Sequence, residues 1–153
     1  MVKLDSIDKK ILKILSEDGR ASASYIAESI SLSVPATTDR IKKLQDSDVI
    51  IGFKPIIDSR KIGLDITAFI TVYSESSKNF EKVVRNAKSN SSIMKCYTTT
   101  GDGSHLLLVK VKNTESLEKL LRTIQGWPGV RRTQTQIVLS SYVQNNSSTL
   151  IKN

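Results

Sequence analysis

Three cationic side chains lie close together in residues 34–46, where the apolar residues recur at helical spacing. They are Arg40, Lys42 and Lys43, and Ile41 and Leu44 give the same segment a buried side. An Arg guanidinium is a planar fork that suits a guanine edge or a phosphate, and a Lys ammonium binds phosphate as a point charge. These residue types support binding of a polyanion, and the alternative is an ordinary solvated basic helix face.

A second candidate cluster is a glycine-rich run between two segments of strand-like pattern. It consists of Thr100, Gly101, Asp102, Gly103 and Ser104. Backbone N–H groups in such a turn can receive a carboxylate, as anion-binding nests do. The alternative is a plain β-turn, since Gly-Asp-Gly is a common turn sequence.

The sequence contains few of the residue types that catalysis commonly uses. The chain holds one histidine and one cysteine, His105 and Cys96. A single cysteine excludes an internal disulfide and a zinc site built from cysteines. We therefore assign no catalytic residue, no metal ligand and no cofactor, and we expect His105 to be a strand residue.

The first 50 residues have the pattern of three helices. Apolar residues at spacings of three and four predict the first helix, which Asp5 caps, while Ser22 and Ser33 can cap the second and third. Only residues 31–33 separate the second helix from the third, so the two helices must cross steeply, as in a helix-turn-helix. The third helix is then expected to enter the major groove of DNA.

The outward face of this third helix decides which residues contact DNA. We expect Thr38 to face inward because it lies three residues before Ile41. Lys42, together with Ser24 and Tyr25 at the start of the second helix, is placed for phosphates. The full predicted DNA-binding set is Ser24, Tyr25, Ser33, Ala36, Thr37, Arg40, Lys42 and Lys43.

Beyond residue 65 the apolar period changes from that of a helix to that of a strand. Strands are predicted at 66–73, 93–100, 104–111 and 130–140, with helices after the first and third, which is the ferredoxin-like βαββαβ plan. The fold class is therefore α+β, with an N-terminal winged helix-turn-helix domain. The predicted divisions are a DNA-binding domain at 1–52, a linker and hinge strand at 53–64, a dimerisation and effector domain at 65–141, and a polar tail at 142–153.

Both predicted helices of the second domain cover the same face of the sheet. The other face is expected to carry Phe69, Tyr73, Ile137 and Leu139 among Thr and Gln. A half-apolar sheet face without a cover usually finds a partner, so we predict a homodimer. Two recognition helices related by a two-fold axis predict a roughly palindromic DNA site.

The positive charge is distributed unevenly along the chain. The 153 residues carry a net charge of +8, of which residues 1–60 supply +1 and residues 61–153 supply +7. DNA binding by residues 1–60 must therefore depend on where their cationic side chains lie rather than on net charge. The positive charge of residues 61–153 has two explanations: DNA wraps around a larger assembly, or the charge only keeps the domain soluble. Apolar runs are too short to span a membrane, so we expect a cytoplasmic protein.

The order of motifs resembles the Lrp/AsnC family of transcription regulators. The similarity lies in VPATTDRIKKLQDSDVI, the linker KIGL, TGDGSHLLLVKV, and WPGV followed by TQTQIVL, over about residues 3–140. The resemblance implies a RAM/ACT-like second domain, homodimers that often form octamers, DNA binding by the first domain, and an amino-acid effector held between second domains. Because residues 34–46 match the family's recognition helix, it implies a base-reading role for Thr37, Arg40 and Lys43.

The effector site also follows from the resemblance. The family's pocket lies at the turn that Thr100–Ser104 occupies here, and Gln134 and Gln136 are candidate contacts from the last strand. Three positions depart from the family pattern. Ser104 replaces a common acid, Gly103 replaces an aromatic residue, and Ser31 replaces a glycine in the inter-helix turn.

The sequence predicts a DNA-binding transcriptional regulator that is a homodimer or a higher oligomer, with an amino acid or related molecule as a possible effector. Two alternatives stay open. One is an architectural, chromatin-like DNA-binding protein without an effector. The other is an enzyme similar to siroheme decarboxylases, which share the two-domain plan.

Overall fold

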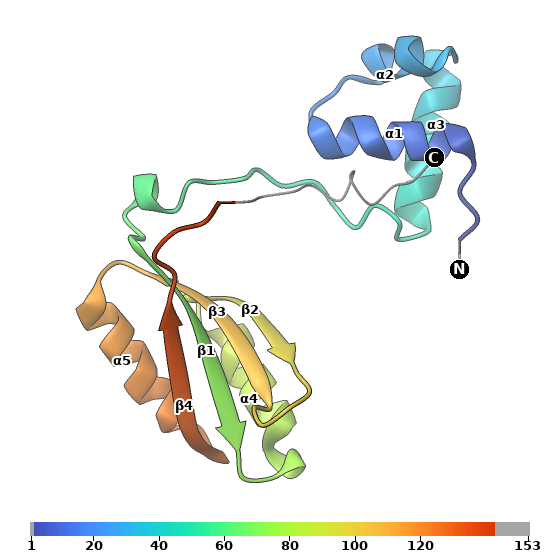
Figure 1. Ribbon diagram of the computed structural model, residues 1–153. Helices are drawn as coiled ribbons and strands as arrows, with labels where there is room; N and C mark the ends of the chain where they lie inside the picture. The colour runs from blue at the N-terminus through green and yellow to red at the C-terminus, as the bar shows by residue number, and fades with distance from the viewer. Residues whose placement is uncertain (1, 143–153) are drawn as a thin grey trace. The chain divides into compact units, whose positions relative to one another are not determined.

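A computed structural model describes residues 2–142, apart from the side chain of Ser77. The predicted tail at 142–153 lies outside the described residues except for Tyr142. The chain divides into two compact units, of which the first includes residues 2–56 and the second is Ile57–Ser141. Figure 1 shows three helices in the first unit and a sheet with two covering helices in the second.

The first unit is built from α1 (Ser6–Glu17), α2 (Ala23–Ile30) and α3 (Val34–Asp46). Each helix begins at a capping side chain, as predicted: the side chains of Asp5, Ser22 and Ser33 accept hydrogen bonds from backbone N–H groups of the first turns. One apolar face of each helix is buried in a common core formed by Ile11, Ile26, Ile30 and Leu44.

The turn between α2 and α3 depends on one left-handed residue. Ser31 has φ 57° and ψ 45°, the conformation that glycine adopts most easily. This conformation lets the N–H of Leu32 donate to the carbonyl oxygen of Ala27 at 3.0 Å. The expectation that Ser31 occupies a position suited to glycine is confirmed.

The wing expected of a winged helix-turn-helix and the hinge strand predicted within residues 53–64 do not form as strands. Residues 51–58 have no regular secondary structure, and only a short 3₁₀ turn at Arg60–Ile62 follows. Gly52 and Pro55 interrupt the apolar run, and a two-stranded ribbon without a third strand is marginal in water. Consequently Ile51 and Ile56 are 92% and 89% exposed.

The second unit has the predicted βαββαβ order. Its elements are β1 (Ile66–Ser74), α4 (Phe80–Ser89), β2 (Ile93–Thr98), β3 (His105–Val111), α5 (Thr114–Gln125) and β4 (Val130–Ile137), with a 3₁₀ turn at Ser77–Asn79 before α4. The strands form one antiparallel sheet in the order β2-β3-β1-β4. Both helices lie on the same side of this sheet (Figure 1), where alternate residues of β1 and β3 form the core with them.

The opposite face of the sheet differs in part from the prediction. Ile137 pairs with Ala68, which is buried under the helices, so Ile137 belongs to the helix side and its assignment to the open face was wrong. The open face instead carries Leu106 and Leu108, which pair across the strands with Thr71 and Phe69. The sequence signal was the unbroken run 106–109, in which successive residues must point to opposite faces.

None of the helices within residues 2–142 is long and apolar enough to cross a membrane.

Candidate DNA-binding and effector sites

The buried side of α3 runs through Thr37, not through Thr38. Thr37 is fully buried, and its hydroxyl donates to the carbonyl oxygen of Ser33 at 3.0 Å. Its prediction as a residue that reads DNA was therefore wrong, because a side chain in the helix core cannot reach a base edge.

The predicted inward position of Thr38 was wrong for the same geometric reason. With 3.6 residues per turn, Thr37 lies within about 40° of both Ile41 and Leu44, whereas Thr38 lies about 120° from Leu44. Thr38 is exposed, and its hydroxyl donates to the carbonyl oxygen of Val34 at 3.0 Å. The angular position of each residue, rather than its spacing from one apolar neighbour, would have placed both threonines correctly.

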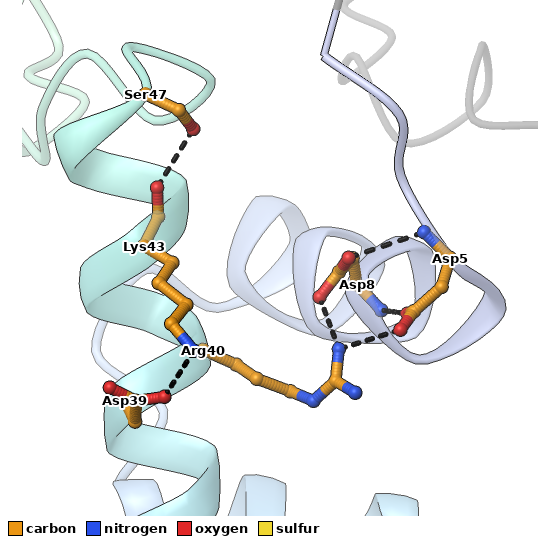
Figure 2. A network of polar contacts seen from close by, with 6 residues as sticks. All are labelled: Asp5, Asp8, Asp39, Arg40, Lys43 and Ser47. Carbon is orange, nitrogen blue, oxygen red and sulfur yellow. Dashed lines mark hydrogen bonds and ion pairs between the residues drawn. The ribbon is translucent and has the colours of Figure 1, made fainter.

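Arg40 extends from α3 to the beginning of α1. Its Nη1 atom lies 2.7 Å from Oδ2 of Asp5 and 2.8 Å from Oδ1 of Asp8 (Figure 2). The backbone N–H of Asp8, followed by the Arg40 guanidinium, lowers the pKa of the Asp5 carboxyl from its usual 3.8. The same two carboxylates raise the pKa of Arg40. The predicted base-reading side chain is thus held within its own unit.

The exposed surface of α3 carries both signs of charge. Lys42 is exposed, and Nζ of Lys43 lies 2.8 Å from Oδ2 of Asp39, an ion pair between residues one helical turn apart. A hydrogen bond from Lys43 lowers the pKa of the Asp39 carboxyl. Asp39 was not among the predicted site residues, although its place next to the cationic cluster was visible in the sequence.

The remaining predicted DNA-binding residues lie around the beginnings of α2 and α3. Ser24 is exposed and Tyr25 is 59% exposed on α2. Ser33 is also exposed, and its hydroxyl oxygen caps α3 by accepting from the N–H of Ala36 at 3.3 Å. Ala36 is half-buried and lines an open hollow of about 490 Å³ between residues 2–8 and α3, which Arg40 also lines.

The predicted effector run forms the turn between β2 and β3. Gly101 has φ 94°, which favours glycine there. At Gly103 a Cβ atom would lie 2.4 Å from Cγ2 of Thr71, so the backbone approaches β1 more closely than any other residue type permits. Thr100 and Asp102 are exposed at the same turn. A residue with a side chain in place of Gly103 could not fit without movement of Thr71.

Ser104 points into the protein rather than toward a ligand. It is 8% exposed, and its hydroxyl lies 2.8 Å from the Ser74 hydroxyl and 2.9 Å from Nδ1 of His105. Its assignment to the effector contacts was therefore wrong, since the side chain is buried and already bonded.

His105 is a residue of β3, as predicted. Its ring is fully buried and meets Phe80 edge to face, with the ring centroids 4.9 Å apart. Nε2 has no partner among the described residues, and burial lowers the pKa of the imidazole from its usual 6.5. The neutral ring is thus a part of the core at the end of the sheet.

The two glutamines of β4 lie on the open face of the sheet. Gln134 pairs with Thr71, which the effector turn contacts at Gly103, and its Oε1 accepts a hydrogen bond from the Tyr73 hydroxyl at 2.9 Å. Gln136 pairs with Phe69, two residues further along β1. The structure therefore brings Gln134 close to the turn through Thr71 and places Gln136 farther away.

Metal chemistry has no candidate site in the described part of the chain. Within residues 2–142, no three His, Cys, Asp or Glu side chains are grouped in a way that could hold a metal ion.

Both units match known domains, and close relatives span nearly the whole chain. Residues 4–51 match the winged helix-turn-helix DNA-binding domain, and residues 67–148 match the Lrp/AsnC ligand binding domain. The HTH-type transcriptional regulator FL11 of Pyrococcus horikoshii is 39% identical over 141 residues, which cover 92% of this chain and 93% of that protein. The regulatory protein AsnC of Haemophilus influenzae is 34% identical, over 92% of this chain and 95% of that protein.

Solved structures agree with this assignment. The feast or famine regulatory protein of M. tuberculosis, solved in a complex with L-methionine, is 29% identical and superposes with a TM-score of 0.87. The superposition covers 94% of this chain and 97% of that chain. The helix-turn-helix, the βαββαβ unit and these relatives together show that the chain belongs to the Lrp/AsnC family of transcriptional regulators.

Proposed function

We propose that the protein binds specific DNA sequences as a homodimer and responds to a small carboxylate effector. The observation that carries the DNA-binding part is the geometry of the first unit. A three-residue turn with a left-handed Ser31 leads into α3, whose exposed face presents Thr38 and Lys42. A helix held in this way fits the major groove, where base edges can be distinguished.

The contacts to DNA divide into two kinds. Lys42 and Lys43, with Ser24 and Tyr25 on α2, supply the exposed charge and hydroxyl groups that suit phosphates and fix orientation. Thr38 is the added candidate for base edges, in place of Thr37. Asp39 can accept a hydrogen bond from the amino group of cytosine once Lys43 has turned to a phosphate.

Self-association is supported by the apolar surface that a single chain leaves exposed. The open face of the sheet carries Leu106, Leu108 and Phe69, each only half-buried, and Ile51 and Ile56 are almost fully exposed. An apolar surface of this kind marks a protein interface. A homodimer would cover it and would present two copies of α3 to a roughly palindromic site. The same proposal extends to octamers built from such dimers.

The proposed effector site is the turn at Thr100–Gly103 with Gln134. Backbone N–H groups of the turn can receive a carboxylate, and the side-chain amide of Gln134 can donate to it. The relative from M. tuberculosis was solved with L-methionine, which supports an amino acid as the effector. Because position 104 is a serine rather than an acid, Asp102 is the one acidic side chain of the turn, and it is the candidate for the ammonium group.

Selection of bound DNA from a random pool, repeated with a panel of amino acids, tests this function. We expect the pool to converge on a two-fold symmetric sequence, and one or more amino acids to change the amount retained. A pool that keeps its random composition would contradict sequence-specific binding. A converged pool that no amino acid alters would contradict the effector part alone.

One alternative is favoured by a specific observation, the excess positive charge of the second part of the chain. Residues 61–153 carry a net charge of +7. Such a surface suits an architectural protein that covers DNA without choosing sites. Footprinting separates the two functions, because protection of a few symmetric sites indicates a regulator and even protection indicates packaging.

A further inference from the structure

The carboxylates that hold Arg40 take part in two sets of bonds. In Asp5, Oδ1 accepts the N–H of Asp8 at 2.7 Å and Oδ2 bonds Arg40. In Asp8, Oδ2 accepts the N–H of Asp5 at 3.2 Å and Oδ1 bonds Arg40. The capping box that begins α1 and the ion pairs that reach α3 therefore share the same two side chains.

The capping box holds both carboxylates in position independently of Arg40. The capping box restricts the rotamers of Asp5 and Asp8, so the guanidinium meets a preformed pair of acceptors rather than two mobile side chains. The side chains of Arg40 and Asp8 are 30% and 17% exposed, which reduces screening by solvent. The contact thus ties the middle of α3 to the first turn of α1 (Figure 2).

The charge of the cluster opposes a direct contact with DNA. Two carboxylates surround one guanidinium, so the cluster has a net charge of −1 and does not attract a phosphate. A base edge or a phosphate would have to displace a charge-assisted hydrogen bond before it could bind Arg40. Lys42 is exposed on the same helix and offers DNA a cation without this cost.

We infer that Arg40 is a positioning residue, which sets the orientation of α3 against α1 through Asp5 and Asp8 and does not itself read DNA. This inference rests on the proposed DNA-binding function. It makes sequence-specific affinity depend on two acidic side chains, although acids near DNA normally weaken binding.

The variant Asp5→Asn tests the inference by the sign of its effect. Asn caps a helix as well as Asp does, so α1 keeps its beginning, while the ion pair with Arg40 is lost. Removal of a negative charge would by itself strengthen DNA binding. Loss of the positioning contact instead weakens binding to the selected site by about threefold to tenfold. Glu28→Gln is the matched control, because it removes an exposed acid of α2 and should leave binding equal or tighter.

Titrations of three variants with DNA decide the outcome. The variants Asp5→Asn, Asp8→Asn and Arg40→Gln are titrated with the selected DNA and with a scrambled duplex at several salt concentrations, and circular dichroism confirms that each is folded. We expect all three to weaken specific binding, with the salt slope of Arg40→Gln unchanged. A slope lower by about one for Arg40→Gln, or tighter binding by Asp5→Asn, would overturn the inference. If the wild type did not prefer the selected duplex, the proposed function itself would fail instead.

Discussion

Ser104 bonds the carbonyl oxygen of Val72 twice, through its backbone N–H at 2.9 Å and through its hydroxyl at 3.1 Å. The beginning of β3 is thereby attached to β1 by a side chain that faces inward. A position that the family resemblance assigns to a ligand contact has become part of the support beneath the effector turn.

The first prediction concerns this support. Ser104→Ala removes the hydroxyl contacts with Val72, Ser74 and His105, and it leaves the buried Nδ1 of His105 without its partner. We expect the free energy of unfolding to fall by about 1–2 kcal/mol, measured by urea denaturation. Ser140→Ala, at an exposed position after β4, is the control and should change stability by less than about 0.5 kcal/mol. Equal effects of the two substitutions would contradict a structural role for Ser104.

The turn between α2 and α3 gives a second prediction. A left-handed conformation costs a non-glycine residue roughly 1–2 kcal/mol. Substitution by glycine removes this cost, but glycine also loses more conformational entropy on folding, which offsets part of the gain in stability. Ser31→Gly should therefore raise the free energy of unfolding by about 0.5–1 kcal/mol. Ser29→Gly, within α2, should lower it by a similar amount. Thermal unfolding of the two variants checks this, and a loss of stability in Ser31→Gly would be inconsistent with the φ of 57°.

The buried imidazole of His105 leads to a prediction on pH. Burial lowers the pKa of His105 below 6.5, so the unfolded chain takes up this proton at a higher pH than the folded chain does. The free energy of unfolding should consequently fall as the pH drops below 6.5, with a slope of at most about 1.4 kcal/mol per pH unit for one proton, and the loss should end at the folded pKa.

His105→Gln provides the comparison for that pH profile. It removes the titrating group and keeps a polar side chain beside Ser104, so the slope between pH 6.5 and the folded pKa should disappear even though overall stability is lower. Chemical denaturation at a series of pH values measures both proteins. Parallel profiles for the wild type and the variant would show that another group causes the pH dependence.

A further prediction concerns the close approach of Gly103 to Thr71. Gly103→Ala places a methyl group 2.4 Å from Cγ2 of Thr71, so the substitution should destabilise the turn. Thr71→Ala removes that methyl group, and the double variant should recover most of the lost stability. A double-mutant cycle by denaturation measures the coupling between the two positions. Additive effects would mean that the turn avoids the clash by moving.

The elements of the fold could be predicted because each is specified locally. Caps at Asp5, Ser22 and Ser33 mark where helices begin, and the change of apolar period near Ile66 marks the sheet. The region around Ile51 was harder, because its β-forming residues indicate a strand but a single chain gives them no partner strand to pair with.

The site could be predicted less completely, because its residues depend on direction and on contacts distant in sequence. Thr37 and Thr38 are adjacent, and a rotation of about 100° decides which one is buried. The contact of Arg40 with Asp5 joins residues 35 positions apart, so no local pattern reveals it. Likewise, Ser104 has the residue type of a ligand contact, but its burial follows from how β1 and β3 meet.

The central claim is that the outward face of α3 reads DNA, and the ratio of affinities for the selected and scrambled duplexes tests it most directly. This ratio is measured for the wild type, for the double variant Thr38→Ala and Lys42→Ala, and for Thr37→Val. The account predicts that this ratio falls to about one in the double variant and stays at the wild-type value in Thr37→Val. A ratio that stays at the wild-type value in the double variant and falls to about one in Thr37→Val would contradict the account.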